Sequence, residues 1–177
     1  MTRAYWSSPV TPLHLLSGAA FANFTAFQDI SPAPAVVLGA NQLETGSELR
    51  LEAWGEFSNT ATPTLSLGFF FGTAAVVLGQ TALTTTTTGA TSWPWHLYLR
   101  GRVRTVGATG TIYCQGYAEI GTSLTAYSGV LPLPTTAAGR VVTIDTTTAK
   151  THGVGAQWGA ASASNTLKTD MFNAELI

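Results

Sequence analysis

Residues 95–106 alternate apolar and polar side chains more regularly than any other part of the chain. The apolar positions are Trp95, Leu97, Leu99 and Val103, and the polar positions are His96, Tyr98, Arg100, Arg102 and Arg104. A period of two places successive side chains on opposite faces of a strand, whereas a helix needs apolar residues every three or four positions. The segment is therefore predicted to be a strand with one core face and one polar face.

The same alternation resumes after a short turn, which predicts a hairpin. Residues 107–110 have a glycine at each end, and residues 111–120 then form the return strand. Its inward positions are Ile112, Cys114, Ala118 and Ile120. On its other face, the polar residues Tyr113, Gln115, Tyr117 and Glu119 are expected to lie beside the arginines of the first strand. Cross-strand pairs of Arg with Tyr or Glu stabilise exposed sheet faces.

Two earlier segments have the same period. Residues 47–58 combine alternating apolar positions with glutamates at i, i+4 spacing, but the period-two apolar series and two glycines favour a strand over a helix. Residues 64–71 alternate between Pro63 and Gly72. The residues predicted to be in the core are Leu49, Leu51, Leu65, Leu67, Phe69, Leu97, Leu99, Val103, Ile112 and Cys114. Further strands are expected at residues 21–27, 36–38, 75–78, 83–88, 130–133, 141–144, 152–158 and 165–177.

About eight to ten short strands separated by turns are typical of a sandwich. We therefore predict an all-β fold, an antiparallel β-sandwich of jelly-roll type with little helix. A length of 177 residues suits one core. Residues 13–177 are expected to form this single domain. Residues 1–12 contain two prolines and are expected to form an extended arm, whose Tyr5 and Trp6 gain most by lying in a partner's groove.

Charge is scarce in this chain. Charged residues make up 10% and the formal net charge is -1, whereas soluble domains usually have roughly 25% charged residues. A surface of Thr, Ala and Gly is easily desolvated against a partner, so oligomerisation or docking is expected. The near-neutral balance argues against nucleic acid as a partner, because phosphate binding needs clustered Lys and Arg.

Signals for targeting and redox chemistry are few. The N-terminal residues have no uninterrupted apolar run before a cleavage site, so we expect no signal peptide and a protein that stays in the cytoplasm where it is made. No stretch has about 20 consecutive apolar residues, so no membrane span is expected. Cys114 is the only cysteine, which excludes an intrachain disulfide and favours a small buried strand residue.

The sequence contains none of the common catalytic motifs, such as a G-x-S-x-G elbow, a phosphate-binding loop or H-E-x-x-H. His14, His96 and His152 are scattered, and scattered histidines are more often ordinary side chains than metal ligands. We therefore predict no catalytic residue, no cofactor and no metal. A hydrolase stays open as an alternative, because two carboxylates can meet only in the fold.

Aromatic residues form the more informative group. Trp93, Trp95 and Tyr98 surround Pro94, and Trp54 lies on the expected outer face of its strand. Rings of this kind hold sugars on some sandwiches, but packing in a core or at a subunit contact is their commoner role. The candidate contacts for a partner or a glycan are Tyr5, Trp6, Trp54, Trp93 and Tyr98.

Three segments carry a resemblance to a family: AKTHGVGAQWGAASASNTLKTDMFNAELI, LRLEAWGEFSNTATPTLSLGFFFG and LYLRGRVRTVGATGTIYCQGYAEI. With their Q-W-G and S-A-S-N-T motifs and apolar last strand, they resemble small structural proteins from the virion gene clusters of tailed bacteriophages. Some members are jelly-roll capsid decoration proteins, and others are minor tail or fibre components.

The resemblance implies a non-enzymatic virion protein that decorates or stabilises a bacteriophage capsid. It implies a homotrimer, with the major capsid protein or tail proteins as partners and attachment through the arm or one edge. A dimer or a monomer stays open. The alternatives are a minor tail or fibre protein, and a carbohydrate-binding module that recognises host glycans.

Overall fold

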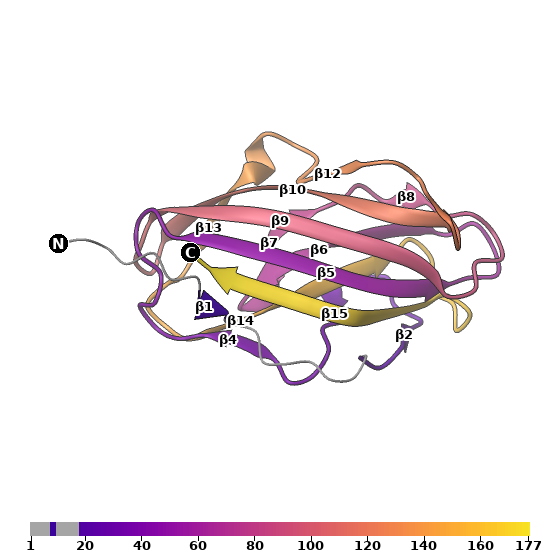
Figure 1. Cartoon of the computed structure of the whole chain (residues 1–177), viewed down its shortest axis with the longest axis horizontal. Helices are drawn as coiled ribbons and strands as arrows, with labels where there is room; N and C mark the ends of the chain where they lie inside the picture. Colours follow the sequence, from indigo (N-terminus) through magenta and orange to yellow (C-terminus); the bar gives the residue numbers. More distant parts are fainter. Residues whose placement is uncertain (1–7, 10–17) are drawn as a thin grey trace.

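The computed structural model describes residues 8–9 and 18–177, and it shows two antiparallel sheets packed as a β-sandwich (Figure 1). Strands account for 55% of the structure and helix for 2%. The helical residues are one 3-10 turn, η1 (Ala138–Arg140). No helix in the described part of the chain is long and apolar enough to cross a membrane. The predicted all-β sandwich with little helix is therefore confirmed.

Nine strands form the larger sheet, here called the large sheet. Its four long strands lie side by side in the order β15 (Thr166–Leu176), β5 (Glu48–Ser58), β9 (Trp93–Thr105) and β10 (Gly110–Ser123). Short strands extend its two edges. Those on β15 are β1 (Ser8–Pro9) and β2 (Phe21–Ala22), and those on β10 are β11 (Ala126–Tyr127), β12 (Leu131–Leu133) and β13 (Val141–Ile144).

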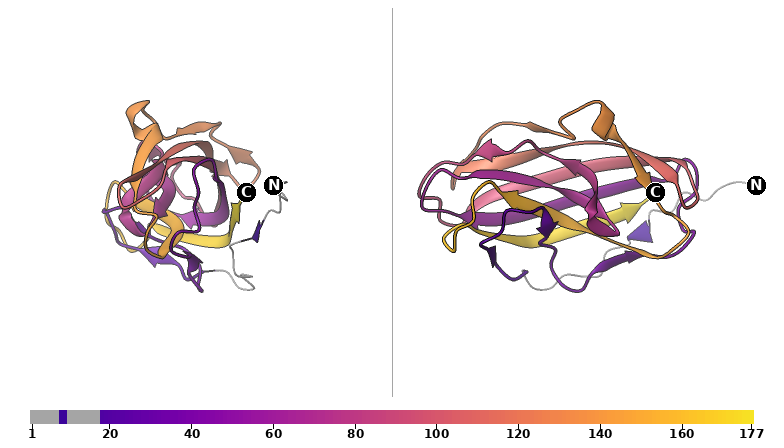
Figure 2. Two further views of the ribbon diagram at one scale, coloured as in Figure 1. Left: turned by 90° about the vertical axis from the view of Figure 1, so that its left-hand side faces the viewer. Right: turned by 180° about the vertical axis from the view of Figure 1, so that it is seen from behind.

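Six strands form the second sheet, here called the small sheet, which lies in front in the right-hand view of Figure 2. Its main path is β3 (Gln28–Asp29), β14 (Lys150–Trp158), β6 (Thr64–Phe71) and β7 (Thr73–Gln80). Off this path, β4 (Val36–Leu38) pairs with β14 and β8 (Thr84–Thr85) pairs with β6. The chain changes sheet between β5 and β6, and again between β14 and β15, so both sheets are needed to close one core.

The core lies between the two sheets, where alternate residues of each strand meet. Trp95 and Leu97 of β9 are fully buried, as the period-two pattern predicts. The rings of Phe69 on β6 and Phe172 on β15 stack with centroids 6.0 Å apart, which joins the small sheet to the large one. All ten residues predicted to be in the core are buried, so the face assignments of these strands are confirmed.

The predicted hairpin is also confirmed. β9 and β10 pair antiparallel from Trp95 opposite Ile120 to Thr105 opposite Thr111. The turn between them includes Gly107 at φ 118°, a backbone conformation that glycine adopts without strain.

The prediction of one strand over residues 21–27 is wrong. β2 ends at Ala22, the backbone turns at Asn23 with φ 62°, and β3 begins only at Gln28. Asparagine tolerates this left-handed conformation, and the turn carries the chain from the large sheet to the small one.

The strand predicted over residues 83–88 is shorter than expected, because only Thr84–Thr85 pair. Thr86 turns inward instead, and its hydroxyl donates to the Pro63 carbonyl at 2.7 Å. The described residues form fifteen strands, of which ten have three or more residues. The expected eight to ten strands correspond to this longer set, since pairs of two residues leave no periodic pattern.

Only Ser8–Pro9 of the predicted arm lie within the described residues, and they pair with Leu176 and Glu175 of β15. This part of the arm therefore lies along the edge of the chain's own large sheet.

Candidate functional site on the outer face of the large sheet

Most of the chain's charge lies on one sheet. The chain has 17 charged residues, and eleven of them belong to strands of the large sheet. They are Glu48, Arg50, Glu52, Glu56, Arg100, Arg102, Arg104, Glu119, Lys168, Asp170 and Glu175. Because the inner face of this sheet is the apolar core, these side chains lie on or beside its outer face, toward the viewer in Figure 1.

The strand register arranges the outer face in rows that cross β5, β9 and β10. The rows are Trp54–His96–Glu119, Glu52–Tyr98–Tyr117, Arg50–Arg100–Gln115 and Glu48–Arg102–Tyr113. Residues directly opposite each other on neighbouring strands lie close enough for their side chains to interact. Arginines therefore gather toward one end of the face, and aromatic rings gather in its centre.

Aromatic rings form a continuous ladder across the centre of this face. Trp54 stacks on His96 with ring centroids 5.0 Å apart and an interplanar angle of 17°. His96 meets the edge of Tyr117 at 5.8 Å, and Tyr117 lies 5.5 Å from Tyr98. Contacts of this kind contribute about 0.5–1.5 kcal/mol beyond burial, so the ladder fixes the side chains in place.

Two carboxylates hold the histidine of this ladder. The Nε2 atom of His96 lies 2.9 Å from Glu52 Oε1, and its Nδ1 atom lies 3.4 Å from Glu119 Oε2. The three residues come from three adjacent strands, β5, β9 and β10. The imidazole ring is therefore anchored on both sides.

Glu48 organises the arginine-rich end of the face. Its Oε1 atom accepts hydrogen bonds from Arg100 Nε at 2.8 Å and Arg100 Nη2 at 2.5 Å, and its Oε2 atom accepts one from Arg102 at 3.2 Å. Burial alone raises the pKa of the Glu48 carboxyl, but these bonds outweigh it and hold the pKa below its ordinary value. Glu48 is thus a charged anchor for two exposed guanidiniums.

Most of the remaining charges on this face form further ion pairs. Arg50 contacts Glu175 at 3.1 Å, and Lys168 Nζ lies 2.9 Å from Glu56 and 3.0 Å from Asp170. These pairs are partly exposed, so each contributes little to folding.

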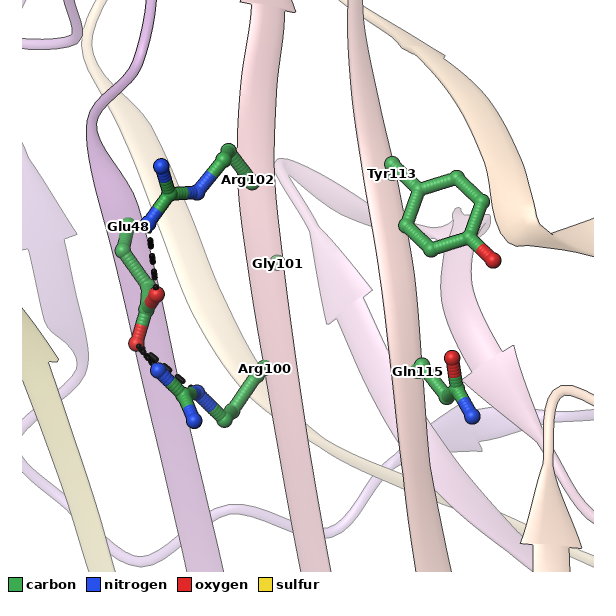
Figure 3. A pocket seen from close by; sticks show the side chains of 6 residues that line it. All are labelled: Glu48, Arg100, Gly101, Arg102, Tyr113 and Gln115. Atoms are coloured by element: carbon green, nitrogen blue, oxygen red, sulfur yellow. Dashed lines mark hydrogen bonds and ion pairs between the residues drawn. The ribbon is translucent and has the colours of Figure 1, made fainter.

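The arginines, Gly101 and the next strand line a hollow of about 370 Å³. Figure 3 shows how its lining residues lie. Arg100 and Arg102 reach from β9 toward Glu48, whereas Tyr113 and Gln115 stand on β10. The strand backbone at Gly101 lies between the two groups and forms the floor.

The candidate contact residues separate in the structure. Trp54 and Tyr98 both lie on the outer face, at opposite ends of the aromatic ladder. Trp93 packs edge-on against the core residue Phe57 at 6.3 Å, on the inner face. A single sugar platform of Trp93 with Tyr98 is therefore not formed. Tyr5 and Trp6 lie outside the described residues.

The other candidate groups also lie apart. Cys114 is fully buried, and burial raises the pKa of its thiol to about 12, which agrees with the predicted core role. His152 is buried at the end of the small sheet, away from His96 on the outer face, and His14 lies outside the described residues. Within residues 8–9 and 18–177 the structure shows no cluster of three or more metal-ligating side chains.

The hollow and its anchor Glu48 were not predicted as a site. Alternation placed Tyr113 and Gln115 beside the arginines, which was interpreted only as sheet stabilisation. The missing information was the register of β5 against β9, which brings Glu48 opposite Arg102. Residues this far apart in sequence leave no local pattern that fixes their pairing.

Comparison with protein-family models, with curated proteins and with solved structures gives no match for this chain. Its function is therefore inferred from the surface chemistry and from the sequence resemblance.

Proposed function

We propose that the chain is a non-enzymatic structural protein of a bacteriophage virion, which decorates or stabilises the capsid. The observation that carries the docking part is the uneven distribution of charge between the two sheets. Eleven charged residues belong to the strands of the large sheet, whereas the strands of the small sheet contain only Asp29 and Lys150. The viral part is supported by the resemblance of the three segments 49–72, 97–120 and 149–177.

Desolvation decides which surface docks. The centre of a protein interface is depleted of charged residues, because a charge removed from water needs a well-placed partner. Both charges of the small sheet are already bonded, Asp29 to the Ser31 amide at 2.8 Å and Lys150 to Asp145 at 2.9 Å. Contact between the small sheet and a shell protein therefore has a small desolvation cost. The large sheet then faces outward.

Uncharged side chains are exposed on and around the small sheet. Val37 on β4 is 51% exposed and Leu83, just before β8, is 48% exposed. Thr73 and Ala75 on the edge strand β7 are also exposed and neutral. The docked partner is the major capsid protein, with further copies of this chain beside it as a trimer.

A matched pair of substitutions tests the orientation. Val37→Asp and Met171→Asp each place a carboxylate at a position that is 51% exposed, the first on the small sheet and the second on the large sheet. We expect Val37→Asp to weaken binding to shells that lack this protein by about tenfold or more, and Met171→Asp to change it little. Cosedimentation with purified shells measures both, and equal melting temperatures show that both variants fold.

Four outcomes would contradict the proposal or a part of it. Loss of binding only in Met171→Asp would reverse the orientation. Binding of the unaltered protein to tails, but not to heads, would favour the minor tail or fibre alternative. Binding to neither would remove the virion role altogether. Light scattering on the purified protein gives its oligomeric state, and a monomer at micromolar concentration would contradict the trimer.

A further inference from the structure

We infer that the hollow over Gly101 is a binding site for an acidic saccharide, a sugar ring that carries a carboxylate. The hollow has a volume of about 370 Å³, within the range of about 300–1,000 Å³ typical of small-molecule sites. It lies on the outward-facing sheet, away from the surface proposed to dock. The inference is tested on the isolated protein and does not depend on a virion.

The charge around the hollow is locally positive. Arg100, Arg102 and Arg104 project from alternate positions of β9, and Glu48 is the carboxylate that contacts the first two. The guanidinium carbon of Arg104 lies 4.6 Å from the centre of the Tyr113 ring. Among the described residues, no carboxylate lies within ion-pair distance of Arg104. Three guanidiniums against one carboxylate leave an excess of positive charge, in a chain whose formal net charge is -1.

The guanidiniums are held before any ligand arrives. Glu48 has a side chain only 10% exposed and fixes Arg100 and Arg102, whose side chains are 53% and 65% exposed. Arg104 rests on the Tyr113 ring. Each guanidinium has five N–H donors, so donors remain for a ligand carboxylate. Because the side chains are already ordered, binding loses less conformational entropy.

The opposite wall supplies the chemistry that distinguishes a saccharide from a simple anion. The Gln115 amide both donates and accepts hydrogen bonds, and the Tyr113 hydroxyl does the same, which suits sugar hydroxyls. Figure 3 shows both groups on β10, across the Gly101 backbone from the arginines. The aliphatic stems of the arginines and the Tyr113 ring give an apolar lining for the carbon face of a sugar ring.

A packing constraint lies below the floor of the hollow. A side chain at position 101 would place a Cβ atom 2.6 Å from Ile112 Cδ1 and 3.2 Å from Cys114 Sγ in the core. Gly101 therefore lets β9 lie close over this layer, and it lines the hollow between Arg100 and Arg102.

Calorimetric titration with a hyaluronan tetrasaccharide tests the site, with the carboxyl-reduced tetrasaccharide as the neutral control. We expect the acidic form to bind with an affinity that falls as salt rises, and the reduced form to bind about tenfold more weakly or not at all. Arg102→Gln and Gln115→Ala are each expected to weaken binding by about tenfold. Arg50→Gln removes a guanidinium that pairs with Glu175 outside the hollow, and is expected to leave the affinity unchanged.

Several results would overturn the inference. These are equal binding of the reduced tetrasaccharide, equal loss in Arg50→Gln, or no binding at millimolar concentration. Inorganic sulfate that binds as tightly as the tetrasaccharide would show an anion site without saccharide recognition. A polyglutamate peptide that binds more tightly would show that the face takes an acidic protein segment. Melting temperatures of all variants separate lost binding from lost folding.

Discussion

The two sheets enclose one core, but their outer faces have different kinds of side chains. The large sheet projects long charged and aromatic side chains from β5, β9 and β10, and these side chains satisfy one another by ion pairs and ring contacts. The small sheet has glycines where such side chains would stand. A Cβ atom on Gly153 would lie 2.5 Å from the Phe70 ring, and one on Gly155 would lie 2.2 Å from the Phe27 ring.

This difference shows where a chain with few charged residues places its water-contacting side chains. Phe70 is only 2% exposed although it lies on the outer side of its strand, because its ring covers the glycine backbone of β14. The small sheet thus has packed side chains on both faces. On the outer face of the large sheet, the polar side chains are satisfied by water and by ion pairs. Assembly is favoured on the first surface and recognition of polar ligands on the second.

The largest expected loss of stability is in the core between the sheets, to which both sheets contribute. Phe69→Ala and Phe172→Ala each remove one ring of the stacked pair that links β6 to β15. Each is expected to lower the free energy of unfolding by about 3–5 kcal/mol, since both rings are fully buried. Urea denaturation measures the loss. A double mutant whose loss equals the sum of the two single losses would show that the rings do not interact across the sandwich.

The next effect is a pH dependence specific to the small sheet. His152 is 1% exposed, and neither ring nitrogen has a hydrogen-bond partner among the described residues. Burial lowers the pKa of His152 from 6.5 to about 4. The unfolded chain therefore takes up a proton at a higher pH than the folded one. Stability is full above about pH 6.5 and is lost as the pH falls toward 4, by up to about 3 kcal/mol.

Unfolding measured between pH 7 and pH 5 tests this, because most carboxylates titrate at lower pH. His152→Leu replaces the imidazole with an apolar side chain that does not titrate, and it is expected to flatten the pH profile. An unchanged slope in this variant would assign the pH dependence to other groups.

The sequence predicted the strands and their faces best where one face of a strand is buried and the other is exposed to solvent. In β5, β9 and β10 the period-two pattern identified both the core residues and the polar face, because burial on one side selects apolar residues at every second position. In β6 the same pattern is weaker as a guide, since Ser66 and Phe70 are buried on the outer side as well. Buried polar partners such as Thr81 for Ser66 leave no periodic signal.

The candidate site was predictable only in part. Arg100, Arg102 and Arg104 were placed on the polar face with Tyr113, as the structure confirms. The role of Glu48 required the β5–β9 register, which long-range pairing sets. Trp93 was grouped with Tyr98 by proximity in sequence, but odd and even positions of one strand face opposite ways.

A third prediction concerns the glycines of the small sheet. Gly153→Ala places a methyl group against Ser31 Oγ and the buried Phe70 ring, at 2.2 and 2.5 Å in the unaltered geometry. We expect a loss of about 1–3 kcal/mol by overpacking. Asn173→Ala on the exposed face of the large sheet is the control and is expected to stay within about 0.5 kcal/mol. Thermal unfolding compares the two, and equal effects would mean that the two outer faces are equally tolerant.

The smallest expected effect is at the ion pairs of the large sheet. Lys168 contacts Glu56 and Asp170, and these bonds raise the pKa of its ammonium group. Its contribution is therefore present at neutral pH and is lost only in the alkaline range above its unfolded pKa. Because the three side chains are about one-third exposed, Lys168→Met is expected to cost less than about 1 kcal/mol at low salt. In about 1 M salt the Debye length falls to roughly 3 Å, so the difference between variant and unaltered protein should nearly vanish. Urea denaturation at the two salt concentrations measures it. A loss above about 2 kcal/mol that persists in high salt would show that this face is held as rigidly as the small sheet, and the contrast between the two sheets would fail.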